Sequence, residues 1–238
     1  MRCLALLIIM FIADRTYPQD TDTHKNKTKE RAYFSEQVAV LRSEYASKVK
    51  MALTQGRAER ARLHYKNFIK NELEGTYMDN FDVSCLNTNK CCINDYSKPM
   101  ILVTYASWCV PGKGEVPVIN HLADKKKGEI DIVVLFWDDR RSARKAAKDL
   151  NNDVHVVYVD ELKNRYIHTI RMLKHSIGFP KVFSIASDKK ILRIRNTKAL
   201  PFHKGIDKAF EENLVFFEDL ISGIRDHEKT LKQNDTKD

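Results

Sequence analysis

The sequence predicts an α/β domain in which a mixed β-sheet is flanked by helices on both faces. Two continuous apolar runs rich in β-branched residues, Met100–Tyr105 and Ile130–Trp137, are typical of strands that are buried on both faces. Helical patterns alternate with these runs, and a hairpin and a terminal amphipathic helix come last. The 238 residues, 43% of them hydrophobic, are sufficient for one such domain with additional segments.

The beginning of the chain has the pattern of an export signal. An apolar run, Cys3–Ala13, follows the single positive residue Arg2 and is too short to span ~30 Å of hydrocarbon as a helix. We expect residues 1–19 to be a signal peptide or anchor and residues 20–32 to be a polar linker. A buried strand or helix is the alternative. Export would place the protein in the periplasm or cell envelope, where disulfides persist.

The charge of the chain does not indicate a nucleic-acid partner. The net charge of +9 arises from 41 Lys and Arg against 32 Asp and Glu, and the basic residues are spread along the chain. A solvated surface is the simplest interpretation, and no motif that would bind a nucleic-acid groove is present. Membrane contact is expected only through residues 1–19, if the signal is retained.

A helical extension is predicted over residues 33–76. Apolar residues recur at spacings of three and four from Phe34 to Tyr45, and Ser35 is a candidate N-cap. A second amphipathic stretch ends near Gly75 and is expected to pair with the first and pack on the domain that follows. These two helices are also a candidate surface for a protein partner.

The predicted main domain covers residues 77–226. We expect short strands at Phe81–Cys85, Cys91–Asp95 and Val154–Val159, helices at Lys113–Lys127, Ser142–Leu150 and Leu162–Lys174, and a hairpin of Val182–Ala186 with Ile191–Arg195. The terminal helix has an apolar face made of Ile206, Phe210, Leu214, Phe217, Ile221 and Ile224. Residues 227–238 form a polar tail that is expected to fray.

A single cysteine stands between the first buried strand and the helix predicted from Lys113. The segment reads YASWCVPGKGEVP from Tyr105 to Pro117, with Cys109 directly after Trp108. Free backbone N–H groups and the helix dipole would favour a thiolate there, so we expect the pKa of Cys109 to lie below its usual ~8.5. A thiolate is the species that attacks a disulfide to give a mixed disulfide.

This segment resembles the active site of extracytoplasmic thioredoxin-like reductases of the TlpA type. The resemblance rests on Trp108-Cys109-x-Pro111-x-Lys113-x-Glu115-x-Pro117, and on Gly178-Phe179-Pro180, which is similar to the cis-proline loop of the family. It extends from about Asp79 to Ile224 and implies a thioredoxin-like fold. It also implies thiol-disulfide exchange without cofactor or metal on protein disulfides or small thiols. The implied site residues are Cys109 as nucleophile, Trp108, Pro111, Glu115 and Pro180 in cis.

Three positions depart from the family pattern. Gly112 replaces the resolving cysteine, Val103 occupies the strand position of a buried carboxylate, and Phe179 is bulkier than the usual residue before the proline. We therefore expect a monothiol oxidoreductase, in which an external thiol resolves the adduct. A non-catalytic binding or adaptor module with an inert Cys109 is the alternative. Peroxide reduction is disfavoured because Ala106 stands where a hydroxyl residue would be needed.

The site residues also have structural interpretations. Trp108 is expected to pack over the sulfur rather than take part in chemistry. Glu115 either exchanges protons with the thiol or is an exposed carboxylate that stabilises the helix start.

The remaining cysteines flank one predicted turn. Cys85 is expected to face either Cys91 or Cys92 across two strands, where a disulfide is plausible, and only one of the two can share its face. One of these thiols could instead resolve the adduct at Cys109. A zinc site is disfavoured, because the histidines show no ligand spacing.

Overall fold

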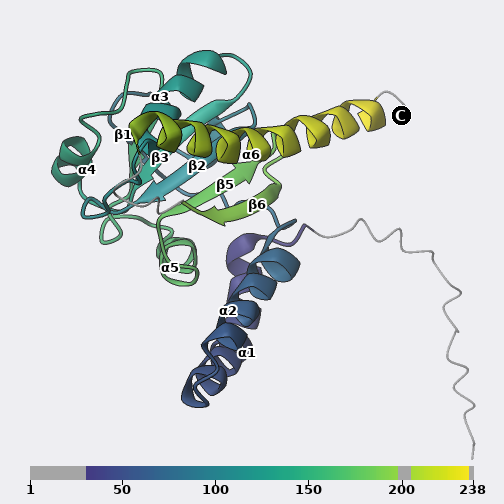
Figure 1. Ribbon diagram of the computed structural model, residues 1–238. Helices are drawn as coiled ribbons and strands as arrows, with labels where there is room; N and C mark the ends of the chain where they lie inside the picture. Colours follow the sequence, from purple (N-terminus) through teal and green to yellow (C-terminus); the bar gives the residue numbers. More distant parts are fainter. Residues whose placement is uncertain (1–30, 198–204, 236–238) are drawn as a thin grey trace, which may run out of the picture. The chain divides into compact units, whose positions relative to one another are not determined.

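A computed structural model describes residues 31–197 and 205–235 of the chain (Figure 1). The predicted signal segment and the linker as far as residue 30 lie outside the described residues. A six-stranded mixed sheet runs through the described part in the order β1-β4-β3-β2-β5-β6. The strands are β1 (Ser84–Cys85), β2 (Met100–Tyr105), β3 (Asp131–Phe136), β4 (His155–Tyr158), β5 (Lys181–Ile185) and β6 (Ile191–Asn196).

Strands β2, β3 and β4 are parallel and form the centre of the sheet. Strand β5 is antiparallel to β2, and β6 is antiparallel to β5. Every residue of β2 and β3 is buried, as their apolar sequences predict. The mixed α/β architecture expected from the sequence, a central mixed sheet flanked by helices, is therefore confirmed.

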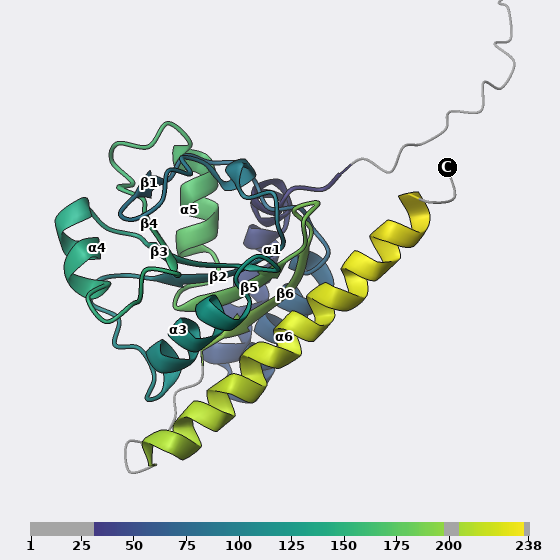
Figure 2. The ribbon, with the colours of Figure 1, turned by 90° about the horizontal axis from the view of Figure 1, so that it is seen from above.

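Helices cover both faces of the sheet (Figure 2). Alternate residues of β2 divide between two apolar clusters: Leu102 belongs to the first and Val103 to the second. The first face is covered by α1 (Phe34–Thr54), η1 (Phe68–Leu73), a π-helical turn that continues α2 (Ala58–Asn67), and α5 (Ile167–His175). The second face is covered by α3 (Glu115–Lys125), α4 (Arg140–Ala146) and α6 (Ile206–Asp235).

The two N-terminal helices share the core of the domain. Phe34 and Val38 of α1 are fully buried in the first cluster, and α1 packs against both α2 and α5. The prediction that Ser35 caps α1 is wrong, because Ser35 lies inside the helix. Instead the carboxylate of Asp79 accepts hydrogen bonds from the backbone N–H (2.9 Å) and the hydroxyl (2.5 Å) of Ser35. A residue distant in sequence thus satisfies a free backbone N–H group in the first turn of α1.

Several predicted boundaries are corrected. Residues Cys91–Asp95 form no strand but a bridge at Cys92 followed by a 3₁₀ turn over Ile93–Asp95. Helix α5 begins at Ile167, which leaves Leu162 exposed in a loop.

The terminal helix differs from the prediction at both ends. Ile206 is half exposed and does not join the apolar face. Helix α6 continues past Asp226 to Asp235 instead of fraying. Beyond Asp226, Glu228 accepts hydrogen bonds from the N–H and hydroxyl of Ser187 in the β5–β6 turn, both at 2.8 Å. These bonds join the helix at Glu228 to the β5–β6 turn.

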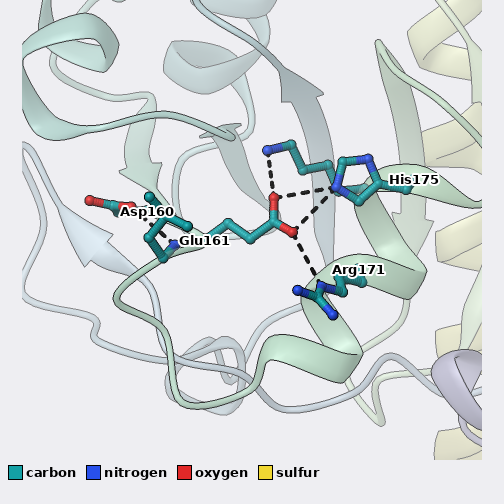
Figure 3. A network of polar contacts seen from close by, with 6 residues as sticks. Asp160, Glu161, Arg171 and His175 are labelled. Carbon is teal, nitrogen blue, oxygen red and sulfur yellow. Dashed lines mark hydrogen bonds and ion pairs between the residues drawn. The ribbon is translucent and has the colours of Figure 1, made fainter.

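A polar network joins the loop after β4 to helix α5 (Figure 3). The carboxylate of Glu161 accepts a hydrogen bond from the Lys174 ammonium at 2.9 Å and lies 3.3 Å from the His175 ring. Hydrogen bonding to Lys174 is the main cause that lowers the pKa of Glu161. The network fixes α5 beside the carboxyl end of β4. None of the described helices combines the length and apolarity needed to cross a membrane.

Candidate functional site

Cys109 lies in a turn beyond the carboxyl end of β2. The strand ends at Tyr105 and helix α3 begins only at Glu115, so an irregular segment separates the cysteine from the helix. The Cys109 N–H donates to the Ala106 carbonyl at 2.8 Å, and the Ala106 N–H donates to the Cys109 sulfur at 3.4 Å. The thiol is partly buried against the second apolar cluster. Pro111, two residues further, is exposed.

The loop before β5 meets this turn through two aromatic rings. The Phe179–Pro180 peptide bond is cis, as the resemblance implies. The Trp108 and Phe179 rings contact each other with centroids 5.4 Å apart and an interplanar angle of 56°. Trp108 nevertheless remains 72% exposed. The cysteine turn and the proline loop, far apart in sequence, therefore meet through the Trp108–Phe179 contact.

Glu115 is a buried carboxylate beneath the turn, with only 1% of its surface exposed. Its Oε1 accepts a hydrogen bond from the Tyr105 hydroxyl and its Oε2 one from the Gly112 N–H, both at 2.7 Å. Burial raises the pKa of Glu115, and these two hydrogen bonds oppose the rise. The interpretation of Glu115 as an exposed carboxylate is therefore wrong. A buried carboxylate is present near the thiol, although Val103 leaves none on the strand.

Asp138 is a second carboxylate at the site, and the sequence analysis did not identify it. It accepts hydrogen bonds from the backbone N–H (2.5 Å) and the hydroxyl (2.8 Å) of Ser107, which fixes the start of the turn. The signal that could have found it is its position two residues after the buried strand β3, whose carboxyl end lies beside that of β2. The Ser107 hydroxyl therefore already donates its proton to Asp138.

The electrostatic prediction for the thiol has the wrong sign. Burial raises the pKa of Cys109, and the charges of Asp138 and Glu115 raise it further, while the Ala106 N–H lowers it. The helix that was expected to favour a thiolate begins at Glu115, too far along the chain to oppose these effects. Cys109 is therefore a thiol rather than a thiolate at neutral pH.

Cys85 lies across the sheet from Cys109. Cys85 pairs with Val157, whose side chain belongs to the first apolar cluster, whereas Cys109 packs on the second, across the sheet. This arrangement does not support Cys85 or Cys91 as a resolving thiol for Cys109. All four cysteines of the described segments are free thiols. Within those segments, no group of three or more His, Cys, Asp or Glu side chains is arranged to hold a metal ion.

Comparison with known proteins finds solved structures that are similar to this chain at low sequence identity. No family model matches the chain, and no curated protein matches it. Among solved structures, the thioredoxin domain of a thiol-disulfide oxidoreductase from Bacteroides vulgatus is 16% identical, with 60% of this chain and 96% of that chain covered and a TM-score of 0.45. A thiol:disulfide interchange protein from Bacteroides sp. is 17% identical, with 51% and 80% covered and a TM-score of 0.43. Peroxidoxin BcpB from Mycobacterium tuberculosis is 16% identical, with 60% and 94% covered and a TM-score of 0.42. The function is therefore inferred from the residues of the site.

Proposed function

We propose that this chain carries out thiol-disulfide exchange through the single thiol of Cys109. The observation that supports this most is the joining of the cysteine turn to the loop of Pro180 by the contact between Trp108 and Phe179. The partly buried sulfur and the largely exposed Trp108 together offer a surface on which a disulfide can dock. The substrates would be protein disulfides or small oxidised thiols.

The raised pKa of Cys109 favours the reducing direction of exchange. Cys109 loses its proton and its thiolate attacks one sulfur of a disulfide, which forms a mixed disulfide and releases the other half as a thiol. An external thiol then attacks the Cys109 sulfur and releases the captured half as a thiol. A second external thiol frees Cys109 and leaves as the oxidised external disulfide. Because a thiol of high pKa is a poor leaving group, attack on the Cys109 sulfur expels the substrate half preferentially.

Peroxide reduction receives less support from the same site. The only hydrogen-bond donor to the Cys109 sulfur among the described residues is the Ala106 backbone N–H. The hydroxyl of Ser107, the nearest such group in sequence, is bonded to Asp138. A peroxide oxygen would therefore lack a side-chain hydroxyl to polarise it.

The test is the reaction of Cys109 with a thiol-reactive probe as a function of pH, followed by peptide mapping. The proposal expects labelling of Cys109 in the native chain, with a midpoint above that of the denatured chain, because burial and two carboxylates disfavour the thiolate. A model peptide disulfide should form a mixed disulfide with Cys109 that an added small thiol releases. No adduct at any pH would refute the proposal.

A binding or adaptor module is the second candidate. Large apolar side chains on the N-terminal helices remain exposed, namely Val40, Met51 and Leu53 of α1 and Leu63 of α2. Such residues are suited to a protein partner. This function requires no thiol, so Cys109→Ser should leave partner binding unchanged, whereas Leu53→Glu should abolish it. The reverse pattern would exclude an adaptor.

We also propose that the chain is exported through residues 1–19 to the periplasm or cell envelope. The apolar run Cys3–Ala13 supports this. Fractionation of the native host should recover the protein outside the cytoplasm, and the mass of its N-terminus should show whether the segment is cleaved. Recovery in the cytoplasm with residues 1–19 intact would contradict export.

A further inference from the structure

A pair of thiols, Cys85 and Cys91, lies at the edge of the sheet, on the face opposite Cys109. Cys85 ends the edge strand β1, and the chain turns back so that the Val83 N–H donates to the Cys91 carbonyl at 2.8 Å. Asp82 and Cys92 form an antiparallel bridge one step further. Cys85 is partly buried and Cys91 is exposed. An accessible thiol thus stands beside a more protected one.

Of the two neighbouring cysteines, Cys91 and not Cys92 is placed to react with Cys85. Side chains alternate along paired strands, so Cys91 shares the face of Val83 and Cys85, whereas Cys92 points to the other face. Burial raises the pKa of Cys85, and the charge of Cys91 raises it further. The Cys92 thiol instead donates to Asp95 at 3.1 Å.

The surroundings of Cys85 include a buried hydroxyl without a partner. The Cys85 thiol donates to the Lys90 carbonyl at 2.7 Å. Tyr96 is fully buried, and within the described residues its hydroxyl has no hydrogen-bond partner. Burial raises the pKa of Tyr96, and the charge of Cys85 raises it further. The Lys90 ammonium lies 4.1 Å from the centre of the Tyr96 ring.

We propose that Cys85 and Cys91 form a second thiol site, a dithiol that reduces small polar disulfides independently of Cys109. The Cys91 thiolate attacks one sulfur of the disulfide and releases the other half as a thiol. Cys85 then attacks the Cys91 sulfur and gives up its proton, so that the second half also leaves as a thiol. The disulfide is reduced, and the dithiol is oxidised to a Cys85–Cys91 bond.

The chemistry of the neighbouring residues defines the class of substrate and the roles of the two thiols. The turn between the two cysteines, Asn87-Thr88-Asn89-Lys90, is polar and therefore suits a small polar disulfide. Cys91 is the thiol that a small disulfide meets first. Tyr96 is a positioning residue, whose free hydroxyl can donate to the thiolate of Cys85 as it forms.

The experiment uses the full chain carrying Cys3→Ser and Cys109→Ser, so that its outcome does not depend on the proposed function of Cys109. The reduced protein is mixed with hydroxyethyl disulfide, and released thiol and protein adducts are followed by mass spectrometry. Trypsin cleaves after Lys90, so a Cys85–Cys91 bond appears as two linked peptides. We expect this bond to form, with both halves of the probe released for each bond.

Three serine variants on this background assign the roles. Cys92→Ser should behave as the parent and identifies the bond as Cys85–Cys91. Cys85→Ser should accumulate a stable probe adduct on Cys91, and Cys91→Ser should form no linked peptides. Tyr96→Phe should slow the conversion of adduct to bond several-fold without slowing adduct formation. A persistent adduct in the parent, loss of the linked peptides in Cys92→Ser, or no reaction would each overturn the proposal.

Discussion

The Tyr105 hydroxyl donates to Glu115 Oε1 at 2.7 Å and thereby joins the end of strand β2 to the first residue of helix α3. The other oxygen of the same carboxylate accepts a hydrogen bond from the Gly112 N–H. Glu115 therefore bonds to residues on both sides of Cys109 in the sequence. The backbone of Gly112 is thus fixed by a carboxylate whose charge also disfavours the Cys109 thiolate. Structure and reactivity of the turn are linked through Glu115.

Replacement of Glu115 by glutamine should lower the pKa of Cys109. The amide can accept from Gly112 and donate to Tyr105, while the negative charge is lost. Because burial is the largest cause of the raised pKa, the value should remain above that of the denatured chain. We expect probe labelling of Cys109 at neutral pH to become about two- to threefold faster, since the thiolate fraction below the pKa rises tenfold per unit. The exposed Glu59→Gln on α2 is the control, and an equal or slower rate in Glu115→Gln would contradict the electrostatic account.

Introduction of a second thiol by Gly112→Cys should give the site a complete dithiol cycle. Gly112 is not among the glycines with positive φ, so a side chain can be accommodated without backbone strain. The new thiol would displace a substrate captured on Cys109, and turnover of a peptide disulfide under excess dithiol should rise about tenfold or more. Gly112→Ser has the same size without the sulfur and should show no gain. Equal turnover in the two variants would mean that this turn does not present Cys109 to disulfides.

The sheet could be predicted closely from the sequence, because burial on both faces imposes continuous apolar runs. Residues Met100–Tyr105 form β2 as predicted, and β3 is only one residue shorter at each end than predicted. The prediction of a strand at Cys91–Asp95 is wrong because a side chain replaces strand pairing there. The backbone N–H groups of Cys91 and Cys92 both donate to Oδ2 of Asp95. Side-chain bonds of this kind compete with strand pairing and leave little trace in the apolar pattern.

Within the candidate site, the cis Phe179–Pro180 bond could be predicted from the sequence, but the electrostatics of Cys109 could not. The start of α3 was placed at Lys113, whereas Gly114 adopts a positive φ of 79° and delays the helix to Glu115. The charge of Asp138 acts on the thiol from just beyond the neighbouring strand β3, and this placement depends on the parallel pairing of β2 with β3. The sign of the Cys109 pKa shift was therefore decided by tertiary structure.

Gly114 should tolerate no side chain, for two separate reasons. Its φ of 79° disfavours other residues, and a Cβ there would lie 2.7 Å from the backbone of Ala209 and of Phe210 in α6. Gly114→Ala should therefore destabilise the fold by more than backbone strain alone, by about 3 kcal/mol or more. Gly128→Ala is the matched control, because Gly128 has a φ of 91° with open space around it and should lose about 1–2 kcal/mol. Denaturant unfolding compares the two, and equal losses would show that α6 does not pack as closely as described.

Lys181 is a buried lysine directly after Pro180. It is 7% exposed, and its ammonium donates to Asn196 Oδ1 at 2.6 Å and lies 5.6 Å from the Tyr65 ring centre. Within the described residues it forms no ion pair with a carboxylate. Burial lowers the pKa of Lys181 from its usual 10.5 to about 8. The protein therefore bears an uncompensated buried charge at neutral pH.

Replacement of Lys181 by methionine should stabilise the protein at neutral pH. The native state binds fewer protons than the unfolded state between about pH 8 and 10.5, so the stability of the unmodified chain rises with pH over this interval. The cost of the buried charge is fully present below pH 8, and its removal should add on the order of 2–3 kcal/mol to the free energy of unfolding. The difference in free energy of unfolding between variant and parent should therefore become smaller as the pH rises from about 8 to 10.5. Lys163→Met, at an exposed position, should show no such dependence. Chemical denaturation at several pH values measures the free energy of unfolding of both variants. A difference between Lys181→Met and the parent that does not change with pH would show that burial does not lower the pKa of Lys181.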